Sequence, residues 1–191
     1  MYNEEDCIRE NIHKLINKLE LLGVSWEYLL IDDGSTDNSK AIAEGAFSEH
    51  SNCRVIHYFP NKGRGYALQQ GFAAATGNYI ITTEADLSWG EGILSELYQA
   101  LIRTGDDIII ASTYLSGGGH INVPIFRRKL SSYGNKILRT CFGGQLTMFS
   151  GMTRGYRRQA IQSIYLTENE KHIHLEIISK AHHLEYTISE I

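Results

Sequence analysis

The sequence predicts an α/β fold in which a mostly parallel sheet is flanked by helices. Three observations predict it: several segments have apolar residues at helical spacing, short apolar runs of strand length alternate with them, and polar or glycine-containing turns separate the two kinds. Strands that alternate with helices need crossover connections, and these cover both faces of a parallel sheet. A chain of 191 residues is long enough for one domain with a hydrophobic core and too short for two large domains.

The elements follow in order along the chain. A helix is expected from about residue 4 to Gly23, because isoleucines and leucines recur there every three or four positions. Strands are expected at 26–31, 54–59, 78–83 and 107–112, and helices between them at 36–47, 65–75 and 91–103. The pattern changes after residue 112, where we predict a long basic helix over 124–142, helices near 154–164 and 173–183, and a final strand over 184–191.

The start of the chain departs from this alternation. The first helix has no strand before it, although a parallel β/α unit needs a strand to lead its helix onto the sheet. We therefore expect that a first strand, a central one in the sheet, is missing from this sequence. A fold that begins with a helix is the alternative.

Composition argues against several classes of protein. The formal net charge of −4 does not suit a general nucleic-acid binder, which needs a basic face. The three cysteines form no CxxC pair, so neither a disulfide framework nor a zinc site is expected. His172 and His174 lack the partners of a familiar metal pattern and are expected to be surface or core residues. With no apolar run of about eighteen residues and a polar start after Met1, we expect a cytoplasmic protein.

Two acidic clusters follow predicted strands. Asp32 and Asp33 come after the strand at 26–31, and Glu84 and Asp86 come after the strand at 78–83. Ligands of open α/β sheets bind at such carboxyl ends. Glu84 and Asp86 are two residues apart, so they can point to one side and hold Mg²⁺ or Mn²⁺ against the phosphates of a nucleotide. The alternative is two polar turns, the first with a helix cap.

A glycine-containing basic loop lies between a predicted strand and a predicted helix. Gly63 would let the backbone approach a ligand, and Lys62 and Arg64 beside a helix N-terminus suit an anion. The alternative is an ordinary loop with two solvated basic residues.

The densest basic cluster falls in the helix predicted over 124–142. Arg128 and Ser132 are four residues apart and share one face of that helix, next to Arg127, so this face could bind a phosphate. A solvated basic stripe is the alternative. The apolar residues of the same helix could contact a membrane surface peripherally or belong to the core.

In this order, these segments resemble family-2 glycosyltransferases with the GT-A fold. The similar segments are 2–5 (Tyr-Asn-Glu-Glu), 32–37 (Asp-Asp-Gly-Ser-Thr-Asp), 61–65 (Asn-Lys-Gly-Arg-Gly) and 75–88, which contains Glu-Ala-Asp at 84–86. Segments 127–135, 150–157 and 174–176 are more similar to the polyprenyl-phosphate branch, which includes dolichol-phosphate mannose synthase. The resemblance covers nearly the whole chain, and the family's opening apolar strand motif is absent before Tyr2, which favours a truncation.

The resemblance implies an inverting, metal-dependent enzyme that moves a sugar from a nucleotide-sugar of the GDP-mannose or UDP-glucose type to a polyprenyl or dolichyl phosphate. Within a single domain, residues 1–112 would bind the donor and residues 113–191 the acceptor. The implied donor contacts are Asn3, Glu4, Asp32, Asp33, Lys62, Gly63 and Asp86. Glu84 and Asp86 would hold the metal, Arg127, Arg128 and Ser132 would bind phosphate, and Asp86 and Arg128 are the catalytic candidates.

The sequence departs from the family pattern at two positions. Glu84 stands where the family has the first aspartate of its metal motif, and Thr113 stands where an arginine is common. Two other functions therefore remain open: transfer to a sugar hydroxyl in the synthesis of a cell-envelope glycan or another polysaccharide, and an inactive, truncated fragment that only binds a nucleotide. A polyprenyl-phosphate acceptor would place the protein at the cytoplasmic face of a membrane.

Overall fold

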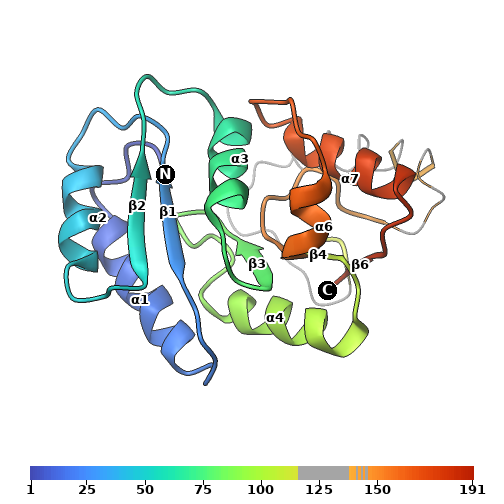
Figure 1. Cartoon of the computed structure of the whole chain (residues 1–191), viewed down its shortest axis with the longest axis horizontal. Helices are drawn as coiled ribbons and strands as arrows, with labels where there is room; N and C mark the ends of the chain where they lie inside the picture. The colour runs from blue at the N-terminus through green and yellow to red at the C-terminus, as the bar shows by residue number, and fades with distance from the viewer. Residues whose placement is uncertain (116–137, 141, 143, 145) are drawn as a thin grey trace.

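The computed structural model describes residues 1–115, 138–140, 142, 144 and 146–191 (Figure 1). Within these residues helices and strands alternate through the first half of the chain, as the sequence predicts. The helices are α1 (Ile8–Glu20), α2 (Ser39–Phe47), α3 (Arg64–Ala74), α4 (Gly92–Thr104), α6 (Arg158–Ser163) and α7 (Ile173–His183). The strands are β1 (Tyr28–Asp32), β2 (Cys53–His57), β3 (Tyr79–Thr82), β4 (Ile108–Ile110), β5 (Arg154–Arg157) and β6 (Ile188–Glu190).

The described strands form two sheets. β1 pairs with β2 in parallel, and the other sheet has the order β3-β5-β4-β6. β5 runs antiparallel to both of its neighbours, whereas β4 and β6 are parallel. β3, β4 and β6 therefore point in one direction. This confirms the predicted α/β class with a mostly parallel sheet, and β5 is the exception.

Helices cover both faces of the strands, because alternate side chains of each strand point to opposite sides. Leu30 of β1 is buried among residues of α1 and α2, whereas the Ile31 side chain faces α3 at Gly71. In the second sheet Ile109 packs with α4, and Ile108 packs with α6 and α7 on the other face. Figure 1 shows β1 and β2 between α1 and α2 on one side and α3 on the other.

One predicted helix begins too early. Residues 154–157 were expected to be helical but form β5, and the helix of this region begins at Arg158. Tyr156 pairs with Ile80 on one side and with Ile108 on the other, so strand pairing decides the conformation of the segment. Gly155 permits this packing, since a Cβ there would lie 2.8 Å from the Leu101 side chain of α4.

The predicted basic helix over 124–142 falls largely outside the described residues. Residues 138–140 of this range are described, and they are helical. Among the described helices, none has the length and apolar character needed to cross a bilayer.

Candidate active site

A cavity of about 950 Å³ lies between β1 and β3 and reaches their carboxyl ends. At those ends its lining includes Glu4, Asp33, Arg64, Glu84 and Asp86. The structure thus brings four predicted site residues, from three separate segments of the chain, to one cavity. Arg64, the first residue of α3, adds a positive charge to the same rim.

Asp33 ties the end of β1 to the loop before α3. Its carboxylate is buried and accepts hydrogen bonds from the backbone N–H groups of Lys62 (2.8 Å) and Gly63 (3.1 Å). Each carboxylate oxygen has a second acceptor direction, so Asp33 can still accept hydrogen bonds from a ligand in the cavity. The Lys62 ammonium lies over the Tyr66 ring, 4.5 Å from its centroid, and is exposed.

The glycines of this loop are required by close backbone contacts. Gly63 has a φ of 94°, and a Cβ there would lie 2.6 Å from the Asn169 carbonyl oxygen. A Cβ at Gly65 would lie 2.4 Å from the Glu168 carbonyl oxygen. The Tyr66 N–H donates to Asn169 O at 3.1 Å. The loop is therefore held between Asp33 on one side and residues 168–170 on the other.

Glu176 of α7 fixes that second segment. Its carboxylate accepts hydrogen bonds from the N–H groups of Thr167 (3.0 Å) and Glu168 (3.0 Å) and from the Lys180 ammonium (2.7 Å). Burial alone would raise the pKa of Glu176, but these hydrogen bonds outweigh it and lower the pKa to about 2. The sequence-based site assignment missed this support, because nothing local in the sequence links residue 176 to the loop at 63–65.

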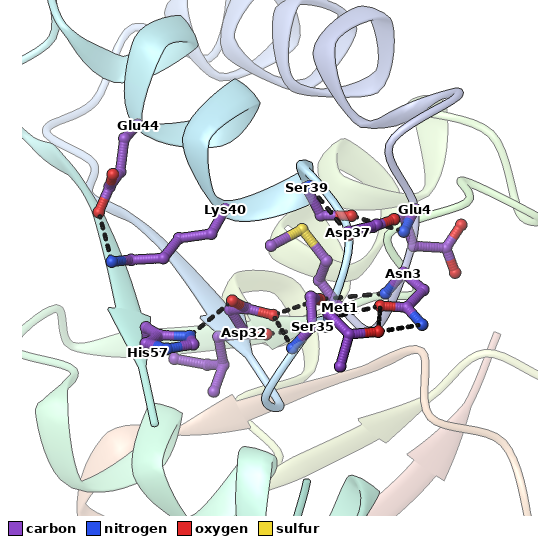
Figure 2. A network of polar contacts seen from close by, with 12 residues as sticks. Met1, Asn3, Glu4, Asp32, Ser35, Asp37, Ser39, Lys40, Glu44 and His57 are labelled. Carbon is purple, nitrogen blue, oxygen red and sulfur yellow. Dashed lines mark hydrogen bonds and ion pairs between the residues drawn. The ribbon is translucent and has the colours of Figure 1, made fainter. Parts of the chain in front are cut away.

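Asp32 is committed to contacts within the protein. One oxygen of its fully buried carboxylate accepts hydrogen bonds from the N–H (3.1 Å) and the hydroxyl of Ser35, and the other lies 2.7 Å from Nδ1 of His57 (Figure 2). His57 ends β2 and was not predicted as a site residue. These contacts hold the turn after β1, and the assignment of Asp32 as a donor contact stays a prediction from the sequence.

Asn3 and Glu4 lie against the same turn (Figure 2). The Asn3 side chain accepts a hydrogen bond from the Thr36 N–H (2.8 Å), and its backbone N–H donates to the Ser35 hydroxyl (3.0 Å). The Glu4 N–H donates to the Ser39 hydroxyl (2.7 Å), and Glu4 is among the residues that line the cavity. Of the two predicted donor contacts, Glu4 is thus placed at the cavity, whereas Asn3 braces the turn.

Glu84 and Asp86 follow β3 and are candidates for holding a divalent cation. Glu84 is half-buried and accepts a hydrogen bond from the Thr153 hydroxyl (2.7 Å), whereas Asp86 is exposed and accepts from the Ser88 N–H (3.0 Å). No group of three or more His, Cys, Asp or Glu side chains in the described part of the chain is arranged to hold a metal. Cations of the Mg²⁺ type are commonly held by one or two carboxylates together with phosphate oxygens and water, and the assignment of this pair to a cation stays a prediction from the sequence.

Arg154 and His174 are both buried and in contact, and this contact was not predicted. The Arg154 guanidinium is fully buried and donates to the carbonyl oxygens of Gly151 (2.8 Å), Phe149 (2.7 Å) and His174 (3.1 Å). Burial, with the neighbouring Arg154 charge, lowers the pKa of His174 to about 3, so its ring is neutral near pH 7. The expectation that His174 is a core residue is borne out by its burial, and His172 is exposed.

The three predicted phosphate-binding residues, Arg127, Arg128 and Ser132, lie outside the described residues. Their assignment stays a prediction from the sequence.

A comparison with known families matches most of the chain. The family described as Glycosyl transferase family 2 matches residues 1–165, which contain every residue of the cavity rim named above.

Similar solved structures include glucosyl-3-phosphoglycerate synthase from Mycobacterium tuberculosis in two complexes. The complex with phosphoglyceric acid has a TM-score of 0.75, and the complex with Mn²⁺, UDP-glucose and phosphoglyceric acid has a TM-score of 0.74. In both comparisons the sequence identity is 18%, and the match covers 100% of this chain but 66% of the synthase chain. At this identity the likeness establishes a common fold, and this chain spans slightly less than two thirds of the synthase's length.

Proposed function

This chain belongs to glycosyl transferase family 2, and we propose that it is an inverting glycosyltransferase that moves a sugar from a nucleotide-sugar to a phosphorylated acceptor. The observation that carries the proposal is the cavity rim at the carboxyl ends of β1 and β3. There Asp33, Arg64, Glu84 and Asp86, from separate segments, line one cavity. A nucleoside diphosphate combines hydrogen-bond donors on its base with negative charge on its phosphates, and this rim offers a partner for each.

On the donor side, Asp33 and the loop at 61–65 would bind the nucleoside. Asp33 already accepts two loop N–H groups, so the loop is ordered before the ligand arrives, which reduces the entropic cost of binding. Asp32, Asn3 and the Ser35 turn would position Asp33. Arg64 would contact a phosphate from the first turn of α3, where the helix dipole also favours an anion.

Glu84 and Asp86 would hold Mg²⁺ or Mn²⁺ beside the diphosphate. When bound, such a cation neutralises charge that develops on the departing nucleoside diphosphate. Glu84 is held in place by Thr153, so it is ready to serve as a ligand, and Asp86 is accessible from solvent. Three of the solved neighbours hold Mn²⁺ together with UDP-glucose, which supports a divalent cation and a uridine nucleotide here.

For the acceptor, we propose a phosphate group. Such an acceptor is already ionised near pH 7, so the reaction needs no strong general base among the rim residues. The motifs at 127–135 and 150–157 favour polyprenyl or dolichyl phosphate as the acceptor. Arg127, Arg128 and Ser132 would bind its phosphate, and Arg128 would also take part in catalysis. The phosphoglyceric acid of the solved neighbours favours a second candidate, a small phosphorylated carboxylic acid. Residues 1–112 would thus serve the donor and residues 113–191 the acceptor.

The two candidate acceptors imply different locations for the reaction in the cell. A lipid phosphate would place the reaction at the cytoplasmic face of a membrane, with peripheral contact through the segment at 124–142, whereas a small acid would place it in the cytoplasm.

The test has two stages. Calorimetric titration with UDP and GDP, each with and without Mn²⁺, should give binding of one nucleotide that depends on the metal. Transfer from the corresponding nucleotide-sugar is then measured with polyprenyl phosphate, 3-phosphoglycerate and a neutral sugar as acceptors. A folded protein that binds neither nucleotide would contradict the proposal, and transfer only to the neutral sugar would refute the phosphorylated acceptor.

A further inference from the structure

A buried hydroxyl group without a partner lies next to the loop that precedes α3. It belongs to Tyr58, the first residue after β2, where the connection to α3 begins (Figure 1). Within the described part of the chain, this hydroxyl has no hydrogen-bond partner. A buried polar group of this kind lowers stability, because it has lost its hydration and gained no hydrogen bond in exchange. Its presence therefore needs an explanation other than the packing of the fold.

Tyr58 faces the same side of β1 and β2 as Asp33. His57 contacts Asp32 across the two strands at 2.7 Å, and successive residues of a strand point to opposite faces. Tyr58 accordingly points toward α3, where its ring makes an edge contact with the Tyr66 ring at 4.9 Å between centroids. Asp33 reaches the same side, because it accepts hydrogen bonds from the loop that begins α3.

The Asp33 carboxylate is the nearest acceptor that acts on this hydroxyl. The pKa of Tyr58 is raised first by burial and then by the Asp33 carboxylate beside it, because a negative charge opposes ionisation of the phenol. Among the described residues, however, no hydrogen bond joins the two groups. Each Asp33 oxygen accepts one loop N–H and has a second acceptor direction. An unused donor and an unused acceptor direction thus lie close together.

The Tyr58 ring is held in place by its neighbours. It packs against the Tyr66 ring at an interplanar angle of 84°, and the Lys62 ammonium lies 5.8 Å from the Tyr58 centroid and 4.5 Å from the Tyr66 centroid. Edge-to-face ring pairs and cations over aromatic faces both stabilise such an arrangement. A partner for the hydroxyl must therefore come to it, and the Asp33 carboxylate is the group placed to do so.

A nucleoside bound at Asp33 would give the carboxylate a reason to take this third donor. The bound nucleoside excludes water from the carboxylate, and a carboxylate in such surroundings is stable only when hydrogen bonds replace its lost hydration. Hydrogen bonds to an ionised acceptor are among the stronger ones. In the same step the Tyr58 hydroxyl gains the partner that it otherwise lacks.

From these observations we propose that Tyr58 is a positioning residue of the donor site, whose hydroxyl donates to the Asp33 carboxylate when a nucleoside is bound there. The inference rests on the proposed function, because it requires Asp33 to contact the donor. It adds a residue that lies outside the cavity lining. It also implies that loss of the hydroxyl affects stability and nucleotide affinity in different ways.

The first test is Tyr58→Phe, which removes the hydroxyl and keeps the ring against Tyr66. Its control is Tyr165→Phe, which removes the hydroxyl of a tyrosine that is 82% exposed. Wild type and both variants are titrated by calorimetry with UDP and with GDP in the presence of Mn²⁺. Their thermal unfolding midpoints are measured without nucleotide, and transfer kinetics give kcat and the KM for the nucleotide-sugar.

We expect Tyr58→Phe to raise the Kd of the nucleotide that wild type binds by at least roughly fivefold, because the complex loses a hydrogen bond to a charged group. The KM for the nucleotide-sugar should rise to a similar extent while kcat stays the same, as for an interaction made equally in the ground state and the transition state. The unfolding midpoint should stay the same or rise, since a buried hydroxyl without a partner is removed. Tyr165→Phe should bind nucleotide as wild type does.

A residue that only supports the fold would lower the midpoint and leave the affinity unchanged. Either result in Tyr58→Phe, a lower midpoint or an unchanged Kd, would therefore overturn the proposal. If wild type binds a nucleotide and Tyr58→Phe binds it equally well, this inference fails and the proposed function stands. If folded wild type binds neither nucleotide, the proposed function fails and the inference fails with it.

The second test asks whether Tyr58 acts through Asp33. When Asp33→Asn is already present, adding Tyr58→Phe should change the Kd by no more than roughly twofold, because residues that act through one contact give non-additive effects. Additive losses in the double variant would overturn the positioning role, since the hydroxyl would then contribute to binding independently of the Asp33 carboxylate.

Discussion

The Asp33 carboxylate accepts a hydrogen bond of 3.1 Å from the Gly63 N–H, which joins the end of β1 to the loop that begins α3. Gly63 in turn packs against Asn169, whose segment is held by Glu176. The rim of the cavity is thus braced from the first strand to the last long helix. Each link of this chain of contacts can be broken separately, and the expected results differ.

Replacing Asp33 with asparagine should weaken nucleotide binding at least tenfold and destabilise the fold by about 1–3 kcal/mol. An amide has one acceptor oxygen, so one of the two loop N–H groups, from Lys62 or Gly63, would face an NH₂ group instead. Calorimetry with the nucleotide and urea denaturation measure the two effects. The control is Glu49→Gln, which removes the same charge at an exposed position outside the cavity lining. Unchanged affinity in folded Asp33→Asn would exclude Asp33 from the donor site.

Replacing Asp86 with alanine should abolish sugar transfer and the dependence of nucleotide binding on Mn²⁺. The side chain is exposed and its one recorded bond is local, so the free energy of unfolding should change by no more than about 0.5 kcal/mol. A chelator such as EDTA should bring the wild-type affinity down to that of the variant. Glu20→Ala, an exposed carboxylate at the end of α1, is the matched control. Wild-type turnover in Asp86→Ala would refute the metal assignment.

A feature of the fold or of the candidate site could be predicted where neighbouring residues in the sequence specify it. The strands that end at Asp32 and Thr82 are apolar runs followed by polar turns, so the fold class and the acidic rim could be derived from the sequence. The pairing of Asp32 with His57 depends on two strands lying in register, and no spacing in the sequence specifies it.

The misplaced helix start at Arg154 has a similar cause. The residues at 154–157 become a strand because β3 and β4 flank them, and these strands lie more than forty residues away in sequence. The burial of the Arg154 guanidinium could not be predicted either, because the sequence does not specify the three carbonyl groups to which it donates.

The contacts of Glu176 predict an acid-dependent loss of stability. Its pKa is lowered from the ordinary 4.5 to about 2, so its hydrogen bonds stabilise the fold above about pH 4.5, and this stabilisation is lost as the pH falls toward 2. In Glu176→Gln the free energy of unfolding should be about 1–3 kcal/mol lower at pH 7, and the difference from wild type should shrink steadily below pH 4.5. Urea denaturation across this pH range measures it, with Glu20→Gln as the control. A difference that stays constant down to pH 2 would contradict the assigned role.

Two glycine substitutions separate a required glycine from a tolerated one. Gly63→Ala should destabilise the fold by at least about 2 kcal/mol, because its φ of 94° is unfavourable for alanine and the new Cβ would meet Asn169 O at 2.6 Å. Gly45→Ala, in the interior of α2 with nothing within 4 Å of the new Cβ, should instead stabilise by about 0.5–1 kcal/mol. Denaturation midpoints of both variants give the comparison.

The Gly63 variant also tests whether the loop and the nucleotide are coupled. Moving Gly63 away from Asn169 would shift the loop against Asp33 and distort the hydrogen bond from the Gly63 N–H to the Asp33 carboxylate. Nucleotide affinity should therefore fall together with stability in Gly63→Ala and remain unchanged in Gly45→Ala. If Gly63→Ala lost stability but bound the nucleotide as tightly as wild type at a temperature where it is fully folded, the Asp33–Gly63 contact would serve the fold alone. The donor would then have to bind elsewhere along the cavity rim, and Asp33→Asn would be expected to leave its affinity unchanged as well.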